Sequence, residues 1–154
     1  MNNNEDILYK NIYGYSTLWI AAWRGSTKCV ERLANEKPEL VDMTEPTYNR
    51  TPLHIASYYG QFETVQYLVK QQNASLTSTN LLGLTSLLYA CYGGANNVIK
   101  FLLRNKADLN ALDTEGNNCL IRAAIGQFNE RSHIQVLNYM FQLKPELLNK
   151  TNYY

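Results

Sequence analysis

Charge of one sign is what this sequence most clearly lacks. Among its 154 residues, Lys and Arg number 14 and Asp and Glu number 13, which leaves a formal net charge of +1. A protein without an excess of either sign creates no field that would draw it to a phosphate backbone or an anionic lipid surface. We therefore expect neither nucleic acid nor a membrane among its partners.

Histidine and cysteine are also scarce, and their arrangement matches none of the usual reactive sites. The chain has two histidines and three cysteines, with no metal-ligand spacing, no predictable Cys and His pair and no glycine-rich phosphate loop. Cys29, Cys91 and Cys119 stand where small or apolar side chains are required, so we expect buried free thiols. The expected function is non-catalytic, with no metal and no cofactor.

Long apolar runs are absent as well. The longest apolar stretch, residues 81–95, is interrupted by Gly, Thr and Ser and is too short to span a bilayer. Residues 1–6 have neither the basic nor the apolar region of a secretory signal. We therefore expect a cytoplasmic protein. The Asn- and Tyr-rich composition suggests an alternative, a secreted bacterial effector that acts in the host cytoplasm.

The sequence instead contains four copies of one short motif, which we call the phrase. Its copies begin 35, 34 and 33 positions apart and occupy residues 16–21, 51–56, 85–90 and 118–123. A period in the low thirties indicates stacked supersecondary units, each of which buries its apolar face only against its neighbours.

Each copy of the phrase predicts the start of a helix. Its first residue can accept a hydrogen bond from the free N–H groups of a first helical turn; these residues are Ser16, Thr51, Thr85 and Asn118. Gly25, Gly60 and Gly94 follow, and glycine can take the left-handed conformation that ends a helix. A second helix is marked by a narrow apolar stripe in every unit, which includes Val30, Val65, Ile99 and Val136.

Residues 49–56, Gly60 and residues 107–111 resemble the ankyrin repeat. The resemblance extends over residues 13–149 and implies an all-α solenoid of about four helix-turn-helix units with β-turn fingers. In that family the fingers and the first helices line a concave face that binds protein partners. The resemblance therefore implies a protein-protein interaction module whose partner the sequence does not identify.

The register of the repeat sets the expected boundaries. Residues 1–12 form a polar amino-terminal segment, and residues 13–154 form the repeat domain, with units over residues 13–47, 48–80, 81–113 and 114–149 and then the start of a further finger. The fourth position of the phrase is a histidine only in the second copy, as His54; in the first copy it is Trp19. We therefore expect apolar packing to hold the loops of the other units. Acidic residues of the first connector, such as Glu45, are expected on solvated surface.

The predicted partner-binding residues lie on the fingers and at the ends of the first helices, which the repeat leaves free to vary. Trp, Tyr and Arg are the residues most enriched at binding hot spots, because they combine a large contact area with a polar group. The predicted surface comprises Tyr13, Tyr15, Trp23, Arg24, Tyr48, Arg50, Tyr58, Tyr59, Leu82, Leu84 and Tyr92, with Glu115, Asn117 and Ile125 in the fourth unit.

The carboxyl end leaves two alternatives open. Apolar side chains stand where a terminal repeat is usually polar, at Tyr139, Phe141, Tyr153 and Tyr154. Either this end self-associates, or further repeats complete it. The second case gives our alternative for the function, in which the chain is the N-terminal targeting part of a larger multidomain protein or secreted effector with an enzymatic domain beyond this chain.

Overall fold

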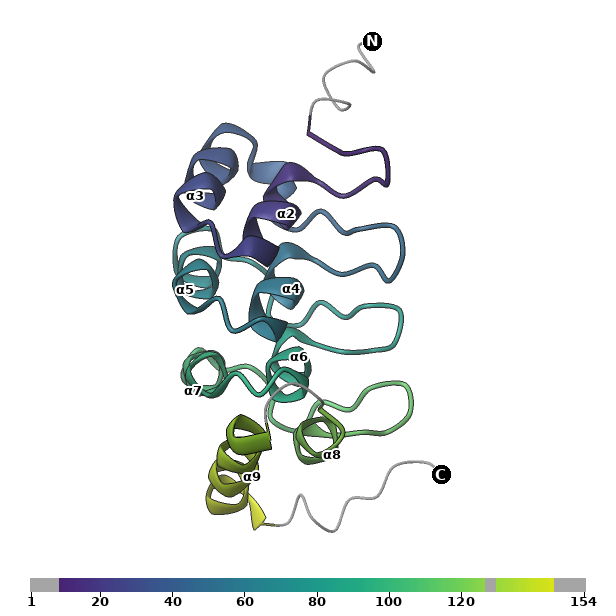
Figure 1. The fold of residues 1–154 in the computed structure, drawn as a ribbon, viewed down its shortest axis with the longest axis vertical. Helices are drawn as coiled ribbons and strands as arrows, with labels where there is room; N and C mark the ends of the chain where they lie inside the picture. The colour runs from purple at the N-terminus through teal and green to yellow at the C-terminus, as the bar shows by residue number, and fades with distance from the viewer. Residues whose placement is uncertain (1–8, 127–129, 146–154) are drawn as a thin grey trace.

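The computed structural model describes residues 9–126 and 130–145, and within them the chain forms a stack of short helix pairs (Figure 1). The α-helices are Thr17–Arg24 (α2), Thr27–Glu36 (α3), Pro52–Tyr58 (α4), Phe62–Lys70 (α5), Ser86–Tyr92 (α6), Asn96–Arg104 (α7), Cys119–Ala124 (α8) and Glu130–Leu143 (α9). A 3-10 helix, Pro38–Leu40 (η1), follows α3. Residues 1–8 of the expected polar segment, together with Tyr153 and Tyr154, lie outside the described residues.

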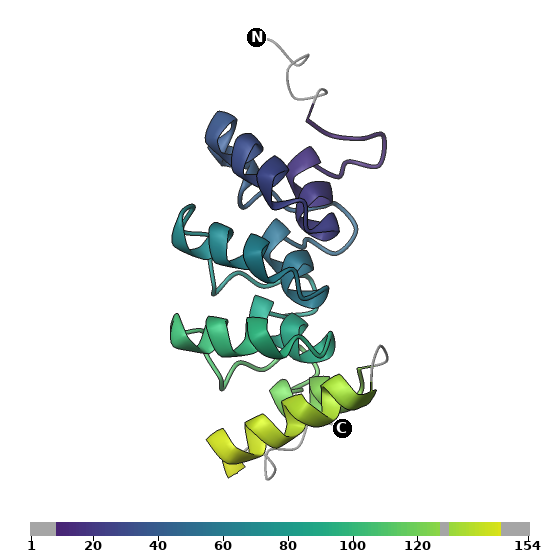
Figure 2. The same ribbon diagram turned by 60° about the vertical axis from the view of Figure 1, so that its left-hand side comes forward.

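The helices form two layers. The first helices α2, α4, α6 and α8 lie one below another, the second helices α3, α5, α7 and α9 form a parallel column, and the loops project on the opposite side (Figures 1 and 2). Within each layer, consecutive helices contact one another. The described residues contain no strand, only an isolated bridge between Lys10 and Ser16. The predicted all-α solenoid is therefore confirmed.

The predicted caps begin the first helix of every unit. The side chains of Ser16, Thr51, Thr85 and Asn118 accept hydrogen bonds from the backbone N–H groups of Trp19, His54, Leu88 and Ile121. The predicted glycines take positive φ angles of 69°, 67° and 69° at Gly25, Gly60 and Gly94. Both signals are local, because a cap needs only the first turn of its own helix and the αL turn needs only a residue without Cβ.

The core lies between the two layers. Fully buried side chains of the second helices include Val30, Val65, Leu68, Ile99, Leu102, Val136 and Met140. The prediction of three buried thiols is wrong for Cys29, which is exposed, whereas Cys91 and Cys119 are buried. The inner helix α5 packs between α3 and α7, whereas α3 is the first of the second helices in the stack. A position that is covered on both sides in inner units is therefore left open in the first unit.

One polar side chain near the start of each loop accepts the loop's own backbone N–H groups. Asn80 Oδ1 accepts from the N–H groups of Leu82 (3.0 Å) and Leu84 (2.9 Å). The equivalent acceptors, which we call the loop anchors, are Asn11, Glu45, Asn80 and Asp113. Our expectation of a solvated Glu45 is therefore wrong: this carboxylate is 1% exposed.

Neighbouring loops are also joined to each other by hydrogen bonds. Leu81 N–H donates to the Tyr48 carbonyl (2.9 Å), and Thr114 N–H donates to the Leu82 carbonyl (3.0 Å). His54 Nε2 bonds to the carbonyl of Ser78 (2.9 Å), which it reaches across 24 positions of sequence. The loops that lack the histidine are thus held by anchors and backbone bonds, and not by apolar packing alone as we expected.

The last described helix, α9, is longer than the other second helices and carries apolar side chains on its outer face. Its 14 residues include Ile134, Phe141 and Leu143, which are exposed. Tyr139 is half-buried against the core. The outer face of the fourth unit is therefore less polar than that of the first unit, where Arg32 on α3 is exposed.

Leu68→Ala is expected to lower the free energy of unfolding by about 2–5 kcal/mol, because the substitution leaves a cavity in a fully buried part of α5. Urea unfolding followed by circular dichroism measures this change. Leu81→Ala is the matched control: its side chain is exposed, and the change should stay within about 0.5 kcal/mol. Equal effects of the two substitutions would contradict the packing described above.

Candidate functional site

A continuous row of aromatic rings crosses the first three units. Successive ring centroids are 4.8, 6.2, 6.2, 5.0 and 5.4 Å apart, and each spacing lies within the range of favourable ring pairs. The members of this aromatic row are, in order, Tyr15, Trp19, Trp23, Tyr59, Tyr58 and Tyr92. The row runs from the first loop across the ends of α2, α4 and α6.

The stacking of the first helices brings these rings together. Trp19 and Trp23 are four positions apart in α2 and therefore share one helix face. The carbonyl groups at the ends of two first helices are bound by the following unit: Gln61 Nε2 donates to the Trp23 carbonyl (3.1 Å), and His133 Nε2 bonds to the Tyr92 carbonyl (3.0 Å). These bonds fix the helix ends that carry the row.

Three arginines lie against rings of the row. The guanidinium of Arg24 lies 4.7 Å from the Trp23 ring, that of Arg50 lies 5.4 Å from the Trp19 ring, and that of Arg122 lies 5.9 Å from the Tyr92 ring. Such cation–π contacts are favourable at these distances. Arg50 and Arg122 also pair with the buried anchors Glu45 and Asp113. Arg24 is exposed and has no ion pair in the described part of the chain.

The surroundings of Tyr58, in the row, and of Glu45, beside it, shift the pKa values of these two groups. Burial, reinforced by the neighbouring Tyr92 and Tyr59, raises the pKa of Tyr58 to about 12, so its hydroxyl stays neutral. Burial opposes ionisation of Glu45, but the hydrogen bonds from Arg50 and from backbone N–H groups outweigh it and lower the pKa of the carboxyl below its usual value. Glu45 is therefore charged and balances Arg50.

Half of the predicted partner-binding residues are exposed, and most of the others are half-buried. Tyr13, Arg24, Tyr48, Tyr59, Leu82, Glu115 and Ile125 are exposed, while Tyr15, Trp23, Arg50, Tyr58 and Tyr92 are half-buried. Two residues depart from the expectation of an accessible surface. Leu84 is 2% exposed because Asn80 binds both its N–H and its carbonyl and turns it into the core, and Asn117 is buried at its anchor Asp113.

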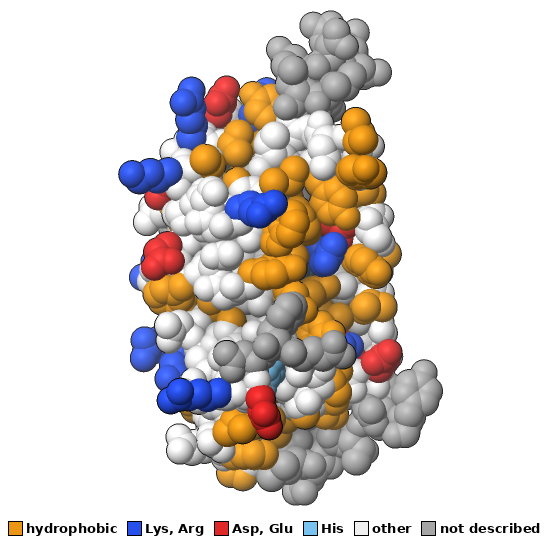
Figure 3. All heavy atoms as spheres, viewed as in Figure 1, with side chains coloured by type: hydrophobic (Ala, Val, Ile, Leu, Met, Phe, Trp, Pro, Cys, Tyr) orange, Lys and Arg blue, Asp and Glu red, His pale blue; other side chains and the backbone are white. Residues whose placement is uncertain are grey.

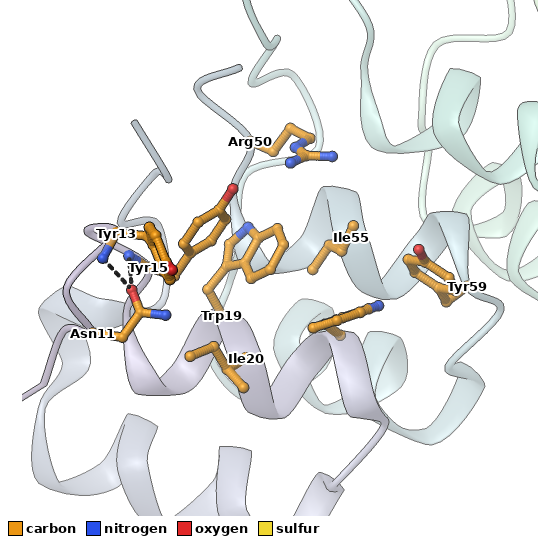
Figure 4. Close-up of a pocket in the computed structure, with 9 residues that line it drawn as sticks. Asn11, Tyr13, Tyr15, Trp19, Ile20, Arg50, Ile55 and Tyr59 are labelled. Atoms are coloured by element: carbon orange, nitrogen blue, oxygen red, sulfur yellow. Dashed lines mark hydrogen bonds between the residues drawn. The ribbon is translucent and has the colours of Figure 1, made fainter. Parts of the chain in front are cut away.

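Trp19 is the member of the row that sequence reasoning missed. We interpreted it only as a replacement for the histidine of the phrase, whereas its ring links Tyr15 to Trp23 and lies on a cavity of about 380 Å³ beside the first loop. Figure 4 shows Trp19 between Tyr15 and Ile55, with Arg50 reaching over from the second loop. A signal was present in the four-residue spacing from Trp19 to Trp23, which places both rings on one helix face.

Both histidines bond to backbone groups of the repeat stack. His54 is fully buried, and its Nδ1 lies 3.0 Å from the Thr51 nitrogen while its Nε2 bonds to Ser78. Burial lowers the pKa of His54 to about 4, so the ring is neutral and structural. The described residues contain no group of three or more His, Cys, Asp or Glu side chains that could hold a metal ion. None of the helices described above is long and apolar enough to cross a membrane.

Comparisons with known proteins agree with this architecture. A family model described as "Ankyrin repeats (3 copies)" matches residues 1–80, and a second, described as "Ankyrin repeats (many copies)", matches residues 68–124. The chain is 32% identical over 85 residues to "Ankyrin repeat and SAM domain-containing protein 6" of Rattus norvegicus. It is 29% identical over 92 residues to the protein of the same name in Mus musculus.

These matches cover 55% and 60% of this chain. They cover 10% of each of the two relatives. The similarity therefore concerns the repeats and not the remaining length of the relatives.

Acid should destabilise the fold through His54. Its pKa is about 4 in the folded state and 6.5 in the unfolded state, so below pH 6.5 the unfolded chain binds a proton that the folded chain does not. The free energy of unfolding should then fall by about 3 kcal/mol between pH 6.5 and pH 4. Urea titrations at several pH values measure this loss.

The control for this prediction is His54→Leu, which places at this position the residue that the third unit has as Leu88. The variant loses the hydrogen bonds of His54, so it should be less stable at pH 7. It should, however, show a smaller loss of stability between pH 6.5 and pH 4. An equal loss in both proteins would assign the pH dependence to other groups.

Proposed function

The chain belongs to the ankyrin-repeat family, and from that premise we propose that it binds a protein partner through the aromatic row and the adjacent loops. Ankyrin repeats are generally protein-protein interaction modules, and members of the family are typically non-catalytic. The observation that carries the proposal is the continuity of the row across three units. Rings that only packed the interior of one unit would not need to contact the rings of neighbouring units, as these do.

The distribution of side chains on this face supports the proposal. Apolar side chains gather over the first helices and the loops, whereas Lys and Arg are frequent at the edge formed by the second helices (Figure 3). Exposed members of the apolar region include Tyr13, Tyr48, Tyr59 and Leu82. A contiguous exposed apolar patch with a polar rim is typical of a binding site.

The dimensions of the row suit a short segment of a partner. Packed first helices lie about 8–10 Å apart, so three of them extend over roughly 20 Å. That length accommodates a few turns of a helix or an extended strand of the partner. Because the rings are held by neighbouring units, the partner would meet a surface that is already ordered, which reduces the entropic cost of binding.

The test compares capture of binding proteins from a lysate of the source cells by wild-type and variant chains. Trp23→Ala and Tyr59→Ala should each weaken binding of the captured partner by about 2 kcal/mol or more, as hot-spot truncations do. Affinities are measured on the purified partner, and thermal unfolding shows that the variants are folded.

The matched control is Tyr67→Ala, which removes a half-buried tyrosine from α5 in the second layer. This variant should retain the wild-type affinity. If the Trp23 and Tyr59 variants bind as the wild type does, the partner uses a different face and the proposed surface is wrong.

A second candidate is that these repeats form the targeting part of a larger protein. Two observations favour it. The relatives named above carry a SAM domain in addition to repeats, by their names, and the matched region is 10% of their length. In addition, Ile134, Phe141 and Leu143 leave an apolar outer face on α9, which a further repeat or a second copy of the chain would cover.

The two ways of covering α9 predict different behaviour of the chain by itself. Self-association should appear in sedimentation as a rise in mass with concentration, and Phe141→Gln should reduce it. A chain that stays monomeric but gains stability when the native downstream sequence is added supports further repeats. A monomer that gains no stability contradicts both.

A further inference from the structure

The cavity beside the first loop has aromatic walls and a polar edge. It lies between the first loop, α2 and α4, and its walls include the rings of Tyr13, Tyr15 and Tyr59 (Figure 4). The ring of Trp23 lines it as well. Trp19 and Arg50 also line it. Its volume of about 380 Å³ lies in the range of sites that bury a small group.

Three side chains at this cavity have donor groups without acceptors among the described residues. Trp19 is 5% exposed, and its indole Nε1 has no hydrogen-bond partner. Arg50 uses Nε for Glu45, which leaves its two terminal nitrogens without a bond. Asn11 Oδ1 accepts the N–H groups of Tyr13 and Tyr15, so the part of Asn11 that remains for a ligand is its amide NH₂.

Because these donors have no acceptor, the cavity favours a ligand that carries a hydrogen-bond acceptor. Buried polar groups are nearly always paired, and a buried N–H without an acceptor is unfavourable. A cation is disfavoured because the free polar groups of these three side chains are N–H donors, which a cation cannot accept. A neutral apolar group would fill the volume but leave the donors unsatisfied. A carboxylate on a short apolar stem satisfies both the donors and the aromatic walls.

We propose that this cavity binds a glutamate or aspartate side chain of an extended partner segment, with an adjacent apolar side chain of that segment on Trp23 and Tyr59. This proposal rests on the proposed function and specifies the chemical group of the partner that the surface recognises. The terminal nitrogens of Arg50 can donate two parallel hydrogen bonds to the carboxylate.

The indole N–H of Trp19 is the second donor to the carboxylate. In the free structure Nε1 is shielded from solvent, and the Arg50 guanidinium lies over the ring. When an incoming carboxylate draws the terminal nitrogens of Arg50 toward the cavity, while Nε stays bonded to Glu45, the edge of the indole is uncovered and one oxygen can reach it. The anchor Glu45 does not compete, because its oxygens already accept three backbone N–H groups and Arg50 Nε.

The experiment selects ten-residue peptides from a random display library on the full, folded chain. The selected sequences should be enriched in Glu or Asp beside an aromatic residue or Leu. One selected peptide is then compared in solution with its Glu→Gln version, and wild type should prefer the acidic peptide by about tenfold. The ratio of these two affinities is the measurement that reports on the cavity.

Three variants test whether the ratio of the two peptide affinities depends on the residues of the cavity. Arg50→Gln should reduce it to about twofold or less, and Trp19→Phe, which keeps a ring but removes the N–H, should lower it by about threefold. Arg24→Gln is the matched control, because this arginine lies on the row but outside the cavity lining; it should weaken both peptides similarly and keep the ratio. If Arg50→Gln fails to fold, Trp19→Phe and the peptide pair in wild type still decide the question.

Several results would overturn the inference. These are a library without acidic enrichment, selection of no peptide at all, equal ratios in the Arg50 and Arg24 variants, and binding that requires a free peptide carboxyl terminus and not a side-chain carboxylate. Peptides that lose affinity in Tyr59→Ala but show no acidic preference would overturn the inference while supporting the proposed function. The two proposals can therefore fail separately.

Discussion

The hydrogen bonding of each loop to its anchor is the interaction on which the rest of the structure depends. A loop that projects from a helical stack exposes backbone N–H groups that no helix can pair. Asn11, Glu45, Asn80 and Asp113 gather these groups onto one side-chain oxygen or carboxylate per loop. Each loop therefore has a fixed shape before any partner arrives.

The anchor of the second loop has the largest consequence. Glu45 is buried and charged, and its charge is balanced by Arg50 and by three backbone N–H groups. Arg50 is held in turn so that its guanidinium lies over Trp19 and Tyr48. A buried ion pair that fixes a loop thus also positions the cation of the proposed binding surface. A similar arrangement recurs in the fourth unit, where Asp113 holds Arg122 near Tyr92.

Replacement of the repeat's histidine changes what the first unit can do. In the second unit His54 reaches the next loop through Ser78, a bond that a tryptophan cannot make in the same way. In the first unit Trp19 instead extends the ring contacts toward Tyr15 and leaves its N–H unpaired. The first unit therefore loses a link to its neighbour and gains an aromatic surface with an unused donor. This exchange is consistent with a unit that serves recognition more than the cohesion of the stack.

The sequence by itself determined the features that depend on a few neighbouring residues. The caps at Ser16, Thr51, Thr85 and Asn118 and the turns at Gly25, Gly60 and Gly94 could be predicted because each is decided within one helical turn. The period of the phrase in turn determined the stacked architecture. Tertiary structure decided the rest, because burial depends on which units lie on either side. It buried Glu45 and Leu84, exposed Cys29 at the first unit, and brought Trp19, Tyr59 and Tyr92 into one row across residues that are far apart in sequence.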